Sequence, residues 1–321
     1  MRVGYHCSHE QHAPSRLLAN AIAAGHTGFA HAMCSDHFAP WSEREGQGHA
    51  GFAWSWLGAA LQATSLSFGT VTAPGQRYYP AVLAQAIATL GEMYPGRFWV
   101  ALGTGEALNE HITGDEWPSR IARRERLSES VTVMRALLRG ETVTHEGRVR
   151  VHEAKVWSRP AQMPALFGAA LSVDTARWVG SWADGLITVA ANSQALREMI
   201  TAFRGGGGEG KPVFVQAAIA HARTESDAEH IARAWAYSGL EDTAFKSDVA
   251  RVAFFDAASA HLPVEKLREA IQISASPSAH VDWIGEQLAC GADRVYVHHV
   301  GWREGDQRRF LDELAPQLLS V

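Results

Sequence analysis

Cysteine is scarce in this chain of 321 residues. The three that occur, Cys7, Cys34 and Cys290, are odd in number, lie far apart and form no Cys-x-x-Cys pair. Zinc ribbons and disulfide frameworks depend on closely spaced or evenly numbered cysteines, so the sequence argues against both classes of protein. The first thirty residues also lack a cationic start followed by an apolar block. We therefore expect a cytoplasmic protein with free thiols.

Long apolar runs and a dominant charge are missing as well. No apolar run approaches the roughly 20 residues that a membrane helix needs. Lys plus Arg number 29 and Asp plus Glu 34, so the formal net charge is 29 − 34 = −5. This balance creates no overall field that would hold nucleic acid or an anionic membrane. We expect neither as a partner, and a small molecule as the substrate.

Short apolar runs instead alternate with longer segments of helical period. The alternation is typical of a parallel sheet covered by helices. No Gly-x-Gly-x-x-Gly follows the first run, which favours a closed barrel over an open doubly wound sheet. We predict one α/β domain over residues 1–321, a TIM-like (β/α)8 barrel with insertions. The predicted strands are Arg2–Cys7, Phe29–Cys34, Leu66–Val71, Phe98–Leu102, Ala165–Ala169, Leu186–Ala190, Val213–Ile219 and Arg294–His298.

Two stretches interrupt the alternation. Residues 141–157 alternate apolar and polar side chains on both sides of Glu146-Gly147, which predicts a hairpin. Residues 222–275 are less regular, and we expect them to form an insertion over the barrel mouth. Neither stretch is predicted to be a domain boundary, because the strand–helix alternation resumes after each.

Chemically active side chains follow the predicted strands, where a βα barrel places its working residues. His37 is a natural general base, since an unperturbed imidazole titrates near neutrality. Asp36 could raise the basicity of His37 and fix its tautomer. Each candidate also has a purely structural interpretation: a satisfied core histidine for His37, packing for Trp41, and a solvated loop carboxylate for Glu106.

Two motifs carry a resemblance to a known family. Ser35–Trp41 reads SDHFAPW, and Gly103–Glu110 reads GTGEALNE. At this separation they resemble the coenzyme-F420-dependent oxidoreductases of the bacterial-luciferase-like superfamily, in particular its F420-dependent glucose-6-phosphate dehydrogenases. The resemblance covers most of the chain and is poorest in the middle and over residues 222–275. It implies a luciferase-like barrel, a flavin or deazaflavin in the barrel mouth, and a homodimer.

The resemblance also implies roles for individual residues. His37 matches the base that removes the substrate's hydroxyl proton, Glu106 the acid that protonates the reduced cofactor, and Trp41 the aromatic residue that steadies the transition state. We expect His37 and Glu106 to flank a single tricyclic ring. Val71 matches a bulge that backs this ring, often with a non-prolyl cis peptide. No metal ligand is implied, and the implied cofactor contacts are Asp36, Val71, Thr72, Thr104, Gly105 and Asn109.

The chain departs from the sugar-phosphate enzymes at their phosphate anchors. Where they have Thr-Ser-Gly-Lys after the sixth strand, residues 189–192 read VAAN, and their two other basic anchors fall near Asp256 and Ala270. Without these cations a sugar phosphate would lose charge-assisted hydrogen bonds, so we predict a different substrate. The family's paired glycines after the fifth strand align with Leu171-Ser172, which leaves open how the cofactor phosphate is held. Residues 4–11 resemble relatives that use FMN, so F420 and FMN both stay open.

The favoured function is hydride transfer between F420 or FMN and a small alcohol or carbonyl substrate. One alternative is an FMN-dependent luciferase-like monooxygenase, which would use the same residues at the barrel mouth. A non-catalytic flavin-binding protein is disfavoured, because binding alone requires neither an acid nor a base. A metal-dependent barrel hydrolase is also possible in principle, although the spacing of its candidate ligands matches no known metal motif. Those candidate ligands are His6, His9, Asp36, His37, His298 and His299.

Overall fold

The computed structural model describes residues 1–190 and 192–321, and its centre is a closed barrel of eight parallel strands. These strands are β1 (Val3–Cys7), β2 (His31–Ser35), β3 (Ser67–Thr72), β4 (Phe98–Leu102), β7 (Ala165–Ala169), β8 (Leu186–Val189), β9 (Val213–His221) and β11 (Arg294–His299). β9 pairs with both β8 and β11 and so closes the barrel. The predicted α/β class and (β/α)8 barrel are confirmed.

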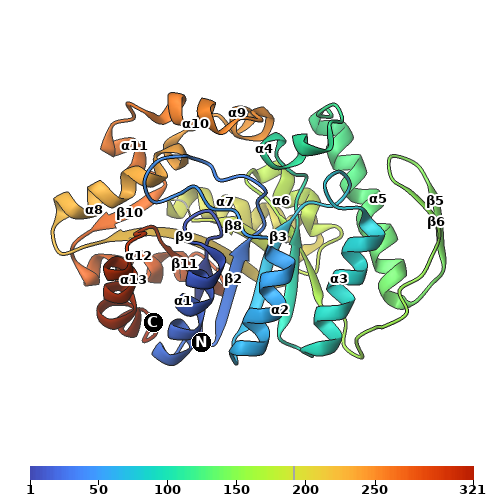
Figure 1. Ribbon diagram of the computed structural model, residues 1–321, viewed down its shortest axis with the longest axis horizontal. Coiled ribbons are helices and arrows are strands. Elements are labelled where there is room, and N and C mark those ends of the chain that lie inside the picture. Colours follow the sequence, from blue (N-terminus) through green and yellow to red (C-terminus); the bar gives the residue numbers. More distant parts are fainter. Residues whose placement is uncertain (191) are drawn as a thin grey trace.

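Helices surround the barrel and connect its strands (Figure 1). Local sequence signals set the ends of the first: it starts with Pro14 in its first turn and ends at Gly28, whose φ of 116° suits glycine. The helices between and after the strands are α1 (Pro14–Thr27), α2 (Ala53–Ala63), α3 (Pro80–Met93), α4 (Ala107–Glu110), α5 (Arg120–Arg139), α6 (Val173–Gly180), α7 (Ser193–Phe203), α12 (Pro277–Ala289), α13 (Glu304–Arg309) and α14 (Ala315–Leu318).

Large side chains fill the inside of the barrel. Trp99, Phe167, Phe214 and Tyr296 form one buried cluster in which the ring centroids of Trp99 and Phe167 are 5.0 Å apart. Gly69 makes room for the indole, because a β-carbon there would lie 1.9 Å from Trp99 Cε2. The barrel is therefore a packed core, and a ligand has to bind at its mouth.

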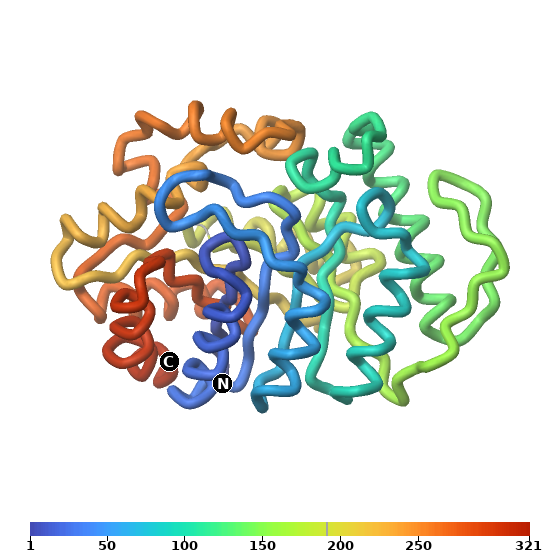
Figure 2. The backbone as a smooth tube through the Cα atoms, in the orientation of Figure 1, coloured from blue at the N-terminus to red at the C-terminus, as the bar shows by residue number. Residues whose placement is uncertain are grey.

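The hairpin and the irregular segment lie outside this core. β5 (Val143–Glu146) and β6 (Arg150–Ala154) pair antiparallel and project away from the barrel (Figure 2). Residues 222–275 contain short helices that run across the carboxyl ends of the strands at the top of Figure 1. These helices are α8 (Glu225–Ala232), α9 (Thr243–Asp248), α10 (Val252–Ser259) and α11 (Val264–Arg268).

A ninth strand of the sheet, β10 (Ile271–Ser274), was not predicted. It pairs with residues 218–221 of β9. The same edge of β9 pairs with β8 through the earlier residues 213–216. β9 is longer than the predicted strand, and its extension beyond the barrel supplies the partner for β10. Four residues are too few to show a period, so only the long-range pairing reveals this strand.

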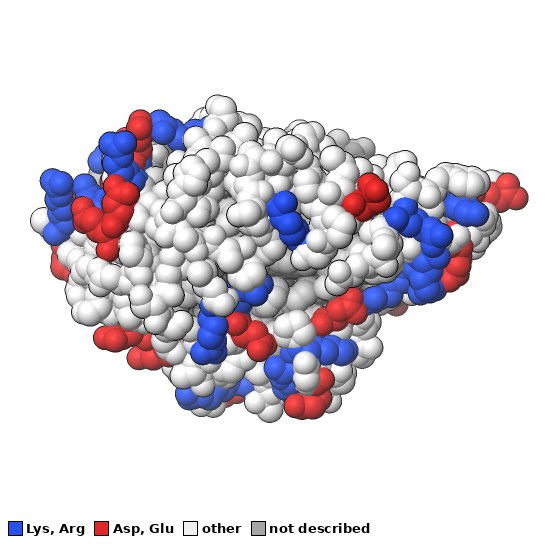
Figure 3. Space-filling view, turned by 90° about the horizontal axis from the view of Figure 1, so that it is seen from below, with Lys and Arg blue, Asp and Glu red and all other residues white. Residues whose placement is uncertain are grey.

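Charges are mixed on the face opposite the barrel mouth. The view from below the barrel shows acidic and basic side chains next to one another around the edge (Figure 3). In the described ranges, no helix combines the length and apolar character that a bilayer crossing demands.

Candidate active site

A buried glutamate in the loop after β1 holds the candidate base. Glu10 is 2% exposed, and its Oε1 lies 2.5 Å from Nδ1 of His37. Its other oxygen, Oε2, accepts hydrogen bonds from Ser8 Oγ at 2.5 Å and Ser35 Oγ at 2.7 Å. The imidazole is thus oriented by Glu10, and the remaining nitrogen, Nε2, is left for chemistry.

Sequence analysis named Asp36 as a residue that could fill this orienting role, but the structure pairs His37 with Glu10 instead. Adjacent residues of an extended chain point in opposite directions, so Asp36 turns away from the side on which His37 lies. Nothing in a single sequence couples Glu10 to His37, because they belong to different βα loops. The usable signal was the carboxylate of Glu10 directly after a strand, at the rim where His37 was expected.

Electrostatics make the Glu10–His37 pair strongly ionic. Burial alone would lower the pKa of His37, but the charge of Glu10 and its hydrogen bond, with a smaller contribution from Glu106, raise that pKa to about 9. Burial would likewise raise the pKa of Glu10, yet the charge and hydrogen bond of His37 and the two serine hydroxyls lower it far below its usual value. At neutral pH the pair is therefore carboxylate and imidazolium.

Glu106 reaches the same imidazole from the start of α4. Its Oε2 lies 3.9 Å from His37 Nε2, and its side chain is 29% exposed. Burial raises the pKa of Glu106, although the positive charge of His37 opposes this shift. The expectation that His37 and Glu106 lie close together at the barrel mouth is confirmed. The expectation that the two groups flank a ring was wrong, because 3.9 Å leaves no room for a ring between them.

Trp41 forms the aromatic wall next to His37. Its indole is 7% exposed and meets the imidazole edge-on, with ring centroids 5.3 Å apart. On its other sides it stacks on Tyr237 at 4.9 Å and contacts Phe255 edge-on at 5.1 Å. Both partners come from residues 222–275, so this segment narrows the space above the candidate base.

Asp36 belongs to a buried hydrogen-bond network that connects neighbouring strand ends at the barrel mouth. Its side chain accepts hydrogen bonds from Thr72 Oγ1 at 2.7 Å and Tyr78 OH at 2.9 Å. Arg77 donates to the backbone oxygen of Asp36 at 2.8 Å, and its backbone N–H donates to Glu110 at 2.7 Å. Asp36 and Thr72 are 3% and 4% exposed. They join neighbouring strand ends, and their implied contact with a cofactor stays a prediction.

Asn109 is another residue whose polar atoms serve the protein itself. Its Oδ1 accepts from the backbone N–H of Phe38 at 2.9 Å and of Ala39 at 3.3 Å, and its Nδ2 donates to Glu106 at 3.2 Å. It therefore fixes the loop that carries His37 relative to Glu106. A direct cofactor contact by Asn109 is a prediction that these geometries do not test.

The loop after β4 is the part of the rim best suited to a flat ligand. Thr104 and Gly105 are partly exposed, and neither makes a hydrogen bond within the described residues. Gly105 has a φ of 82°, and a β-carbon there would lie 3.1 Å from Glu110 Cγ and 3.3 Å from Ala73 Cβ. The free backbone N–H groups of Thr104 and Gly105 fit the polar edge of a flavin or deazaflavin.

Val71 points into the barrel. It packs against the interior cluster that contains Trp99 and Phe167. The backbone of the described residues contains no cis peptide bond, so the cis peptide that the resemblance implies near Val71 is not present. Val71 can contact a ring in the barrel mouth only from the side of the barrel interior.

Apart from His37, the histidines considered as metal ligands are buried core residues. His298 Nε2 lies 3.1 Å from Gln11 Oε1, and His299 Nε2 lies 3.0 Å from the backbone oxygen of His221. Burial lowers the pKa of both His298 and His299, which keeps them neutral. Among the residues the structure describes, no three His, Cys, Asp or Glu side chains are arranged to hold a metal ion. This geometry argues against the metal-dependent hydrolase.

The whole barrel matches a known family. A family model described as luciferase-like monooxygenase matches residues 1–294. The chain belongs to this luciferase-like family. The predicted enzyme class, an oxidoreductase of the luciferase-like family, is confirmed by this match and by the relatives that follow.

Similar members of the luciferase-like family are oxidoreductases by name. An F420-dependent glucose-6-phosphate dehydrogenase from Intrasporangium calvum is 34% identical over 333 residues, covering 99% of this chain and 98% of that enzyme. The enzyme of the same name from Mycobacterium tuberculosis is 35% identical over 335 residues, with 99% and 98% covered. A solved F420-dependent secondary alcohol dehydrogenase, bound to an F420–acetone adduct, superposes with a TM-score of 0.91 at 29% identity, covering 99% and 98%.

In this luciferase-like protein the Glu10–His37 pair makes stability depend on pH. The folded-state pKa of His37 is raised from 6.5 to about 9, so its contribution is fully present below pH 6.5 and is lost as pH rises through about 9. Raising the pKa of His37 from 6.5 to about 9 corresponds to about 3 kcal/mol of stability. Urea unfolding should show that the free energy of unfolding is lower at pH 9.5 than at pH 6.5 by about this amount. In His37→Gln this difference should be absent. Equal losses in both proteins would contradict the ion pair.

Proposed function

We propose that this chain is an F420-dependent oxidoreductase that transfers a hydride between the deazaflavin and a small, neutral secondary alcohol or its ketone. The observation that carries the proposal is the row of contacts from Glu10 to His37 and from His37 to Glu106. Glu106 directly follows Thr104 and Gly105, whose backbone N–H groups are free. A proton donor or acceptor is thereby fixed at the place where a ring and a substrate would meet.

The protein's part in the reaction is to handle one proton and to exclude water. When bound, the cofactor supplies or accepts the hydride. His37 Nε2 donates a proton to a carbonyl oxygen during reduction and removes the hydroxyl proton during alcohol oxidation. Glu10 stays ionised throughout and stabilises the imidazolium. Trp41, Tyr237 and Phe255 keep the space above His37 apolar.

The full-length similarity to F420-dependent enzymes supports F420 rather than FMN. Purified protein should be titrated separately with F420 and FMN while the absorption of each ring is followed. We expect F420 to bind more tightly and the reduced complex to be stable in air. Tight FMN binding with rapid oxygen consumption would favour the monooxygenase instead.

The substrate space favours a small neutral molecule. The aromatic side chains of Tyr237 and Phe255 close one side of it. Near the position of a sugar-phosphate anchor the chain has the carboxylate of Asp256, which is held by Ser42, by the backbone N–H of Glu43 at 3.0 Å, and by Arg44 Nε at 3.3 Å. Because Arg44 is already paired with Asp256, the two together offer a phosphate group no net positive charge. Residue 191, within the other departure at residues 189–192, lies outside the described residues.

This arrangement predicts which substrates have the higher kcat/KM. Acetone with reduced F420, or 2-propanol with oxidised F420, should react with a kcat/KM at least tenfold above that of glucose 6-phosphate, because the sugar phosphate has no cationic partner to offset the loss of its hydration. Initial rates followed by deazaflavin absorbance measure this ratio. Turnover of glucose 6-phosphate at the higher rate would refute the assignment of the substrate class.

A further inference from the structure

The segment that covers the barrel mouth brings a lysine to the candidate active site. Lys246 belongs to α9, which packs against α4, the helix that begins directly after Glu106. Its neighbour Phe245 joins the apolar cluster of Trp41 and Leu108, and Leu108 is itself a residue of α4. The contact between the two short helices therefore carries Lys246 to the side of the barrel mouth where Glu106 lies.

The ammonium group of Lys246 is held by the protein but has no paired carboxylate. Its Nζ donates a hydrogen bond to the backbone oxygen of Ser238 at 3.1 Å, and its side chain is partly buried. In the part of the chain that the structure describes, Lys246 makes no ion pair. Lys266 of the same segment differs, because it pairs with Glu241 and Glu269. The charge of Lys246 is thus available to other groups at the barrel mouth.

Glu106 is the carboxylate on which this charge acts. Burial raises the pKa of Glu106, and the charges of Glu10 and Glu110 act in the same direction, whereas the charges of His37 and Lys246 lower that pKa. The interaction is mutual: burial lowers the pKa of Lys246, and the charge of Glu106 opposes this shift. Glu106 therefore has an imidazolium and an ammonium as neighbours, and both favour its ionised form.

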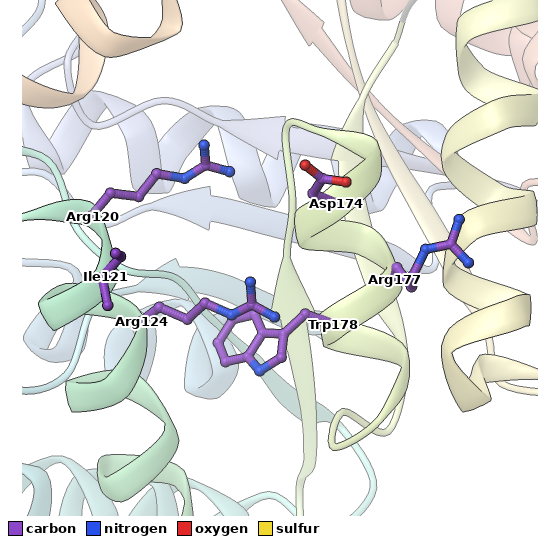
Figure 4. Close-up of a pocket in the computed structure, with 6 residues that line it drawn as sticks. All are labelled: Arg120, Ile121, Arg124, Asp174, Arg177 and Trp178. Atoms are coloured by element: carbon purple, nitrogen blue, oxygen red, sulfur yellow. The ribbon is translucent and has the colours of Figure 1, made fainter.

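The arginines of the adjoining helix α5 lie elsewhere. Arg123 pairs with Asp248 at 2.9 Å, which fixes the end of α9 against α5. Figure 4 shows Arg120 and Arg124 at a surface cavity between α5 and α6, where the guanidinium of Arg124 lies 4.5 Å from the centre of the Trp178 ring. None of the residues that line this cavity belongs to the candidate active site. These three guanidinium groups therefore do not take the place of Lys246.

An ionised Glu106 suits the proposed function, on which this inference rests. In ketone reduction the hydride goes to the carbonyl carbon, and His37 Nε2 gives its proton to the carbonyl oxygen. A second proton leaves the reduced cofactor with the hydride, and the Glu106 carboxylate can accept it. Glu106 Oε2 and His37 Nε2 are 3.9 Å apart, so the accepted proton can pass on to His37 and restore both groups. The ketone then gains one hydride and one proton, and the protein ends the cycle unchanged.

We propose that Lys246 is a positioning residue for this proton transfer. Its ammonium keeps Glu106 in the carboxylate form between turnovers and favours passage of the accepted proton to His37. Without this charge, burial would favour the neutral acid, and the proton would stay on Glu106. The segment over the barrel mouth thus contributes a charge beside Glu106, in addition to the aromatic side chains of Tyr237 and Phe255 beside Trp41.

The test measures the protonation of Glu106 in the protein without cofactor. Infrared spectra over a pH series follow the carboxyl stretch of protonated side chains, and the band of Glu106 is the one that is missing in Glu106→Gln. Lys246→Met keeps the length of the side chain and removes the charge. The midpoint of the Glu106 band should then rise by about one pH unit, a roughly tenfold change in the protonation equilibrium. Lys246→Arg should keep the wild-type midpoint.

Lys155→Met is the matched control. Lys155 is an exposed lysine after β6, and its Nζ lies 4.7 Å from the centre of the Trp157 ring. Its replacement should leave the Glu106 midpoint unchanged. Turnover of acetone with saturating reduced F420 gives a second readout, because the acidic limb of the kcat profile should move to higher pH in Lys246→Met and stay in place in Lys246→Arg and Lys155→Met.

The outcomes separate this inference from the proposed function. An unchanged Glu106 midpoint in Lys246→Met would overturn the inference, whatever the turnover of acetone. A raised midpoint in Lys246→Arg as well would also overturn it, because the effect would then come from altered packing and not from charge. If the midpoints move as expected but F420 supports no turnover, the proposed function fails, and with it the role of Lys246 in the reaction, while the charge interaction stands.

Discussion

Replacing His37 with glutamine is expected to slow turnover by about 10²- to 10⁴-fold, the range usual for loss of a general acid or base. Glutamine preserves polarity and approximate size but cannot exchange a proton near neutral pH. F420 affinity should stay within about twofold, because Thr104 and Gly105 are untouched. Single-turnover rates of acetone reduction and fluorescence titration of F420 measure the two quantities separately.

His26→Gln is the matched control for this substitution. His26 is an exposed residue in the last turn of α1, and its replacement should leave the rate unchanged. Full turnover by His37→Gln would remove the proton-transfer role and favour the view that the protein only binds a flavin. Loss of F420 binding in the same variant would place His37 in cofactor binding instead.

Glu10→Gln is expected to move the pH dependence of the reaction by more than two units. The pKa of His37 is about 9 because Glu10 outweighs burial. Without that carboxylate, burial prevails and the pKa falls to its ordinary value of 6.5 or lower. At pH 7.5 the imidazolium population, and with it ketone reduction, should then fall about tenfold or more. Profiles of kcat/KM from pH 6 to 10 show the shift.

The reverse reaction provides an internal check of Glu10→Gln. Alcohol oxidation needs the neutral imidazole, so its rising limb should move from about pH 9 toward pH 6.5 or below. A variant that was merely unstable would lose both directions at every pH. Glu286→Gln, on the exposed face of α12, is the control that removes one carboxylate without altering either profile. Unchanged limbs in Glu10→Gln would show that another group sets the pKa of His37.

Much of the site could be predicted because its members follow the carboxyl ends of strands in one parallel barrel. His37 and Trp41 follow β2 and Glu106 follows β4, and in a parallel barrel these ends share one rim. The partner of His37 could not be predicted in this way. Glu10 and Asp36 are both carboxylates near the rim, and only the direction of the chain after β1 and β2 decides which one reaches the imidazole.

The sequence by itself determined the barrel and the kind of chemistry, because strand length, helical period and the residue types after each strand are local properties. The tertiary structure decided which charges act together. It buried Glu10 against His37 and turned Asp36 toward Thr72. Electrostatic interactions depend on distance and burial, and both are fixed only when the chain has closed into its barrel.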